Sequence, residues 1–166
     1  GERIGYVMQN PNQMLVKDMI RDEITLALKL RRVDQKTIDE KLELVLGLCG
    51  LSKMRSWPVS ALSYGQRKRV TIASILVMQP KIMIFDEPTA GQDYFHYREI
   101  MDFLDRLNRE MGLTILFITH DMHLAIEYTD RAVVMADGEK IGDGDVFRML
   151  SDPDILRRAS LKETSL

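Results

Sequence analysis

The apolar residues of this 166-residue chain form two kinds of pattern, short continuous runs and stripes with helical spacing. Short apolar runs predict strands over residues 4–8, 81–86 and 114–119, and the continuous run within the second of these is typical of a parallel strand covered on both faces. Apolar positions three, four and seven residues apart predict helices, and they cover residues 17–31, 36–49, 65–78 and 95–111. Strands that alternate with helices predict an α/β fold with a mainly parallel sheet.

The last third of the chain has shorter elements. Asp137-Gly138 is the strongest hairpin signal, and it predicts paired strands over residues 131–136 and 139–141. A short helix is expected over residues 122–128. Two more short helices should end the chain, the second with Pro153 at its first position.

Composition narrows the class of protein. Apolar residues make up 45% and charged residues 29%, a balance typical of one globular domain. No apolar run approaches the roughly 20 residues that span a bilayer. The formal charge of −2 lacks the basic surplus of nucleic-acid-binding proteins. The single cysteine, Cys49, lies on an apolar helical stripe, which favours a buried thiol over a metal or redox site.

The segment Leu62-Ser63-Tyr64-Gly65-Gln66 predicts the start of a helix. Ser63 and Gln66 have the Ser-x-x-Gln spacing of a capping box. The serine hydroxyl and the free N–H groups of the first turn point toward one spot, which the helix dipole makes attractive to an anion. The alternative is an ordinary helix cap, which occurs in any protein.

Two adjacent carboxylates, Asp86 and Glu87, follow the apolar run of residues 82–85. Ligands of open α/β sheets bind at the carboxyl ends of the strands. Nucleotide hydrolysis needs one group to position Mg²⁺ and another to orient the attacking water, and neighbouring side chains can divide these roles. The alternative is that either residue only caps the turn at Pro88-Thr89. His120 follows the next apolar run in the same way, where the alternative is an incidental surface residue.

The order of a capped helix, a strand with an acid pair and a strand with a histidine resembles the ATP-binding subunits of ABC transporters. The resemblance implies ATP and Mg²⁺ as cofactors. It implies that Asp86 holds the metal through its waters, as in a Walker B motif, and that Glu87 is the general base. It also implies that His120 contacts the γ-phosphate and helps to hold the attacking water, and that Gln9 reaches Mg²⁺ and this water from a loop.

Nucleotide contacts from the helix start are implied by the same resemblance. Ser63 and Gly65 would contact the terminal phosphate through a hydroxyl and a backbone N–H, with Gln66 completing the motif. Tyr64 replaces the first glycine of the usual Leu-Ser-Gly-Gly-Gln. Residues 90–93 retain only the aspartate of the usual Ser-Ala-Leu-Asp, so Asp93 is expected at a dimer interface.

The sequence Gly-x-x-x-x-Gly-Lys-Ser/Thr, which cradles the β- and γ-phosphates, is absent from the 166 residues. In the family it lies upstream of the strand before Gln9. We therefore expect an incomplete P-loop NTPase, a RecA-like core fragment over residues 1–9 and 63–166, with a helical ABC subdomain over residues 10–62. Alone, the chain is expected neither to bind ATP tightly nor to hydrolyse it. An uncovered edge of the sheet should favour self-association.

The function implied is that of an ATP-hydrolysing subunit of an importer, bound peripherally at the cytoplasmic face of the membrane. Residues 10–62 would contact a transmembrane subunit, and a second ATPase subunit, identical or different, would complete the nucleotide sites. Residues 9–13 and 119–123 look closest to energy-coupling-factor importers, which take up vitamins, their precursors, or cobalt and nickel ions.

Two alternatives stay open. One is a soluble ABC ATPase acting on ribosomes or DNA, although the interval from Gln9 to Ser63 is too short for the long coiled coil of the DNA-acting class. The other is a non-catalytic module that pairs with an intact ATPase. No nucleic-acid partner is expected for the favoured function.

Overall fold

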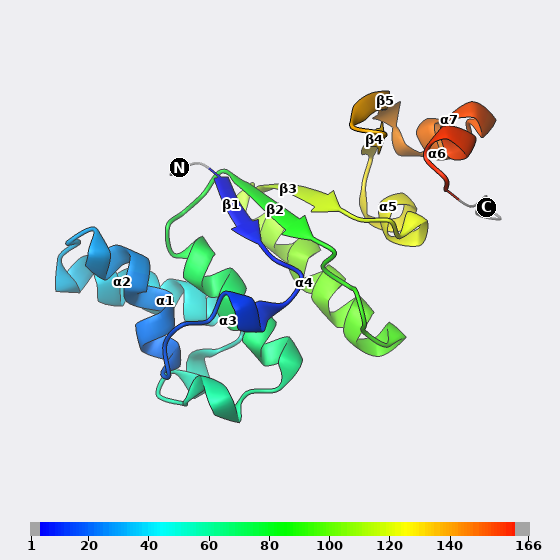
Figure 1. Ribbon diagram of the computed structural model, residues 1–166. Helices are drawn as coiled ribbons and strands as arrows, with labels where there is room; N and C mark the ends of the chain where they lie inside the picture. Colours follow the sequence, from blue (N-terminus) through cyan, green and yellow to red (C-terminus); the bar gives the residue numbers. More distant parts are fainter. Residues whose placement is uncertain (1–3, 162–166) are drawn as a thin grey trace. The chain divides into compact units, whose positions relative to one another are not determined.

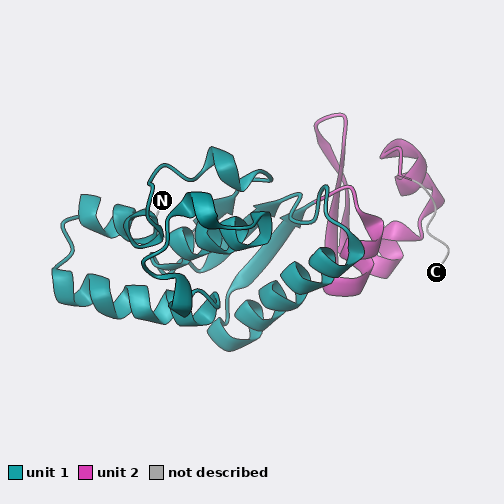
Figure 2. Ribbon diagram, turned by 90° about the horizontal axis from the view of Figure 1, so that it is seen from below, with its two compact units in different colours: residues 1–118 teal, residues 119–166 magenta. Residues whose placement is uncertain are grey.

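The computed structural model describes residues 4–161 and divides the chain after Ile118 into two compact units (Figure 2). The first unit contains β1 (Ile4–Val7), α1 (Ile20–Leu30), α2 (Gln35–Leu48), α3 (Tyr64–Leu76), β2 (Ile82–Asp86), α4 (Tyr94–Met111) and β3 (Thr114–Ile118). Short 3₁₀ helices lie between them at Pro11–Gln13, Ser52–Met54 and Val59–Ala61. The second unit contains α5 (Met122–Tyr128), β4 (Arg131–Ala136), β5 (Glu139–Asp145), α6 (Val146–Leu150) and α7 (Pro153–Arg158).

The first unit is built on a parallel three-stranded sheet in the order β1-β2-β3 (Figure 1). Val7 lies opposite Phe85, and Asp86 lies opposite Ile118. The strands are parallel, so their carboxyl ends share one edge of the sheet. This arrangement confirms the predicted α/β fold.

One face of the sheet is packed against helices. Gly5 brings β1 close to α3, since a Cβ at this position would lie 2.3 Å from Cγ2 of Ile75. Phe85 is buried on the same face, and its ring lies 6.1 Å from that of Phe117 on β3. α4 also contacts β3. It packs on this same side of the sheet, since Leu116, which points to the opposite side of β3, is 47% exposed.

The opposite face of the sheet is open to solvent. Its large apolar side chains, each about half exposed, are Ile4, Tyr6, Leu116 and Ile118. The prediction of a buried strand over residues 4–8 is therefore wrong for the face of β1 that carries Ile4 and Tyr6. The helices that contact the sheet in the first unit gather on one side, and a continuous apolar run does not reveal how many of its faces are packed.

The first long helix begins later than residue 17 because an acidic side chain organises the preceding segment. Glu23 is almost fully buried, and its Oε2 accepts the backbone N–H groups of Val16 at 2.9 Å and Lys17 at 2.7 Å. These hydrogen bonds place residues 16–17 outside the helix, which starts at Ile20.

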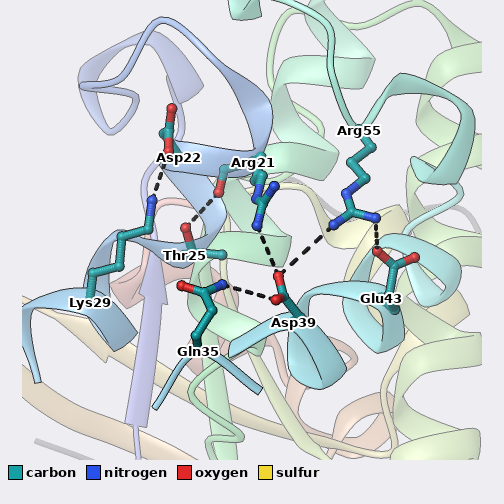
Figure 3. A network of polar contacts seen from close by, with 8 residues as sticks. All are labelled: Arg21, Asp22, Thr25, Lys29, Gln35, Asp39, Glu43 and Arg55. Carbon is teal, nitrogen blue, oxygen red and sulfur yellow. Dashed lines mark hydrogen bonds and ion pairs between the residues drawn. The ribbon is translucent and has the colours of Figure 1, made fainter. Parts of the chain in front are cut away.

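A polar network connects α1, α2 and the segment that follows them (Figure 3). Asp39 on α2 accepts from Arg21 on α1 at 2.9 Å and from Gln35 at 3.0 Å. Arg55 lies 2.6 Å from Glu43 and 4.0 Å from Asp39. Surface ion pairs of this kind contribute little stability each, and here they connect the two helices and the following segment through exposed side chains.

The second unit contains the predicted hairpin. Asp137 and Gly138 both have positive φ, 49° and 80°, as a type I′ turn requires. β5 runs to Asp145, beyond the predicted end at residue 141, and Asp145 pairs with Arg131. The extension includes Gly142 and Gly144. Glycine has a low strand propensity, so this part of β5 was not predicted, but both residues pair with β4 through their backbones.

Candidate functional site

The candidate site of the first unit lies where β1 and β2 end. Asp86 is the last residue of β2 and Glu87 follows it, while Gln9 lies two residues beyond β1. Because the two strands are parallel neighbours, these residues follow strand ends at the same edge of the sheet. The residues of this unit that were predicted to bind Mg²⁺ and the attacking water thus lie at one edge of the sheet.

Asp86 has a partner that the sequence analysis did not identify. Its Oδ2 accepts a hydrogen bond from the hydroxyl of Tyr6 at 2.7 Å, and this bond raises the pKa of Tyr6. Tyr6 pairs with Ile84, two residues before Asp86, so both side chains lie on the exposed face of the sheet. The alternation of side chains along β1 predicts which residues share a face with Tyr6. Only the register between β1 and β2 shows that its hydroxyl lies beside Asp86.

Glu87 opens a constrained turn. It has a φ of 44°, in the left-handed region that non-glycine residues seldom adopt. Its N–H donates to the carbonyl of Ile118 on β3 at 2.8 Å, and its carbonyl accepts from Ala90 at 3.2 Å. Such conformations persist where the surrounding structure holds them, and they cluster at functional sites.

The start of α3 has the predicted capping box. The hydroxyl of Ser63 accepts the N–H of Gln66 at 3.2 Å, and the Gln66 side chain accepts the N–H of Ser63 at 2.9 Å. A Cβ at Gly65 would meet nothing within 4 Å, so the first turn is open to an incoming group. Free N–H groups and open space at a helix start suit a phosphate oxygen.

Tyr64, the departure from the usual motif, connects this helix start to the loop after β1. Its hydroxyl donates to the carbonyl of Gln9 at 3.2 Å. Arg67, one turn later, donates to Oδ1 of Asn12 at 3.1 Å. The structure therefore brings together Gln9 and the first turn of α3, which are 55 residues apart in the sequence.

Lys68 is a further residue that the sequence analysis missed. It is only 1% exposed, and its ammonium donates a hydrogen bond to the carbonyl of Pro88, directly after Glu87. The available signal was a lysine on the buried stripe of α3, which also carries Thr71 and Ile72.

Asp93 caps α4, and its side chain forms its hydrogen bonds within the first turn of that helix. It accepts the N–H of His96 at 3.0 Å and pairs with Nδ1 of the same residue at 2.9 Å, and the first of these bonds contributes most to lowering the pKa of Asp93. Tyr94 and Phe95, the first two residues of the helix, are each more than 70% exposed. An acidic cap followed by exposed aromatic rings is compatible with the predicted interface role.

His120 belongs to the second unit, at its beginning. It precedes Asp121, which caps α5 by accepting the N–H groups of His123 at 3.0 Å and Leu124 at 3.2 Å. The site geometry described above is that of the first unit and does not include His120.

Among residues 4–161, no group of three or more His, Cys, Asp or Glu side chains could hold a metal ion. Mg²⁺ in nucleotide sites uses one or two carboxylates together with phosphate oxygens and water. The Asp86 carboxylate and the Gln9 amide oxygen therefore fit Mg²⁺ bound with a nucleotide. Within the same described part of the chain, no helix combines the length and apolar character that crossing a membrane requires.

Comparison with known proteins gives a consistent result. The family model described as ABC transporter matches residues 1–90. The chain is 58% identical over its full length to a putative ABC transporter ATP-binding protein of Clostridium perfringens, and 58% identical over 99% of its length to one of Enterococcus faecalis. It spans 29% of the length of each of these relatives.

A solved structure is also similar. This is cbiO1 from Clostridium perfringens, described as part of the ABC transporter complex cbiONQ, with 33% sequence identity and a TM-score of 0.83. The similarity covers 96% of this chain and 63% of cbiO1. It confirms the P-loop NTPase-like fold and supports the resemblance to energy-coupling-factor ATPases.

Proposed function

The chain belongs to the ABC transporter family, and from this premise we propose that it is part of the ATP-hydrolysing subunit of an energy-coupling-factor importer. The observation that carries the proposal is the position of Asp86 and Glu87 at the carboxyl edge of a parallel sheet, whose neighbouring loop at Gln9 is bonded to the capped start of α3. The chain spans 29% of the length of its curated relatives, and hydrolysis and transport are proposed for a polypeptide of that full length.

In the proposed reaction, residues of the first unit have separate roles in hydrolysis at the γ-phosphate. Asp86 would hold Mg²⁺ through its waters, and the chemistry that the ion would supply there is neutralisation of charge on the phosphate oxygens. Glu87 accepts a proton from the attacking water, and the Gln9 amide helps to orient that water. His120, from the second unit, is proposed to contact the γ-phosphate.

The start of α3 serves the nucleotide of a partner ATPase. Ser63, Gly65 and Gln66 are proposed to contact that nucleotide, and Asp93 to lie at the interface between the two ATPases. The curated relatives are about twice as long as cbiO1, judged by the shares that this chain covers. This length leaves room for a second ATP-binding domain in the same polypeptide.

Residues 10–62 are proposed to contact a transmembrane subunit, which would bind the protein peripherally at the cytoplasmic face of the membrane. Support comes from cbiO1, whose description makes it part of an ABC transporter complex. The network around Asp39 is compatible with the same role, since it connects the exposed faces of α1 and α2 within these residues (Figure 3). The net charge of −2 favours a protein partner over a nucleic acid.

The test is a Glu87→Gln substitution in the full-length polypeptide. Removing a general base lowers a rate by about 10²- to 10⁴-fold, so steady-state ATP hydrolysis should fall by that factor while equilibrium ATP binding is retained. Glu110→Gln, at an exposed position on α4, is the matched control and should hydrolyse ATP normally. Undiminished hydrolysis by Glu87→Gln would contradict the proposal.

A further inference from the structure

A buried ammonium connects α3 to the turn that carries Glu87. Lys68 is 1% exposed, and burying an ammonium group costs several kcal/mol unless hydrogen bonds compensate. Its Nζ donates to the carbonyl of Pro88. A methionine or leucine would fill the same space without this desolvation, so a lysine here is better explained by its bond than by packing.

The carbonyl that Lys68 binds is the only hydrogen-bonding group on the Pro88 backbone, because proline has no N–H. The turn is thereby held from two sides. β3 accepts the N–H of Glu87 at 2.8 Å, and α3 donates to the next residue. Thr89, which follows, is only 7% exposed. The left-handed conformation of Glu87 is held in place by contacts of this kind.

We propose that Lys68 is a positioning residue that couples the start of α3 to the orientation of Glu87. The inference rests on the proposed function, in which Ser63 meets the nucleotide of the partner and Glu87 acts on the other nucleotide. Lys68 lies five residues after Ser63 on one helix, a separation of about 7.5 Å along its axis. A shift of α3 on engaging the partner's nucleotide is transmitted through Lys68 to the Glu87 turn, so the state of one site affects catalysis at the other.

Amide hydrogen exchange in the 166-residue chain tests the physical link without any need for hydrolysis. In Lys68→Met, the amide of Ala90, which closes the turn onto Glu87, should exchange at least about ten-fold faster, while amides in α1 and α2 keep their rates. Lys29→Met, which removes an exposed ammonium paired with Asp22, is the matched control and should leave Ala90 unchanged.

Two results overturn the link. One is unchanged exchange at Ala90 in Lys68→Met, and the other is an equal acceleration at all amides, which would indicate a role in overall stability alone. If Lys68→Met does not fold, Lys68→Gln, with a shorter neutral donor, is measured by the same criteria.

Hydrolysis by the full-length polypeptide tests the catalytic consequence. Lys68→Met should lower kcat about ten-fold or more and leave KM for ATP within about two-fold, since a positioning residue acts on the transition state. An unchanged kcat, or a change in KM alone, overturns the coupling. If Glu87→Gln also hydrolyses ATP normally, the proposed function fails, while the exchange result for the turn stands or falls separately.

Discussion

At the scale of single residues, Lys68 makes stability depend on pH in an unusual direction. Burial lowers its pKa from 10.5 to about 8. Between these values the unfolded chain binds more protons than the folded chain, so this residue raises the free energy of unfolding as pH increases from about 8 to 10.5. The full shift corresponds to roughly 3 kcal/mol, as an upper bound.

Urea unfolding of the wild type and of Lys68→Met at pH 7.5, 9 and 10 isolates this contribution. Other groups titrate in both proteins, so the difference between their unfolding free energies reports Lys68. We expect that difference to move in favour of the wild type by at least about 1 kcal/mol between pH 7.5 and 10. A difference that stays constant would mean that Lys68 has an ordinary pKa.

Single residues also show what the sequence could and could not predict. The capping box of Ser63 and Gln66 was predictable because both partners lie within one helical turn. The contacts of Tyr6 with Asp86 and of Lys68 with Pro88 join residues 80 and 20 positions apart. Contacts of that kind depend on strand register and helix packing, which a single sequence does not specify. The catalytic roles of the site residues stay predictions.

At the scale of elements, the packing of α3 on β1 depends on one glycine. A Cβ at Gly5 would lie 2.3 Å from Cγ2 of Ile75, so Gly5→Ala forces helix and strand apart. Overpacking of this kind costs about 1–3 kcal/mol. Thermal or urea unfolding should show this loss, and the double variant Gly5→Ala with Ile75→Ala should show a smaller one than the sum of its parts.

Gly47→Ala is the matched control for Gly5→Ala. Gly47 lies inside α2, where a Cβ would meet nothing within 4 Å. Alanine favours a helix interior over glycine by up to about 1 kcal/mol, so this variant should be as stable as the wild type or more so. A Gly5→Ala variant as stable as Gly47→Ala would refute the close approach of α3 to β1.

The boundaries of helices and strands could be predicted from the sequence where short-range signals determine them. The Asp137-Gly138 turn set the hairpin, because both residues tolerate positive φ. The start of α1 was missed because Glu23 takes the N–H groups of residues 16 and 17, a choice that depends on the burial of a carboxylate. The sequence alone does not show that a glutamate on a helix will be buried.

At the scale of the whole molecule, the order of motifs predicted the α/β fold and the ABC family, and both are confirmed. Motif order is reliable here because Gln9 and the acid pair each follow a strand, and neighbouring parallel strands bring their carboxyl ends to one edge whatever lies between them. The start of α3 follows a 3₁₀ helix instead, and its local capping box made it recognisable. The proposed division into a core over residues 1–9 and 63–166 and a helical part over residues 10–62 stays a prediction, separate from the two compact units.

The open face of the three-stranded sheet leads to the last prediction. Its half-exposed apolar side chains include Leu116 and Ile118, and β1 and β3 are the outer strands of this sheet. Exposed apolar patches and unpaired strand edges favour association between molecules. Sedimentation velocity should therefore show the 166-residue chain associating as its concentration rises. Leu116→Lys should weaken the association, whereas Leu30→Lys, at a more exposed position at the end of α1, should not. Equal effects of the two substitutions would show that the chain associates through general hydrophobicity and that the sheet face has no special part in it.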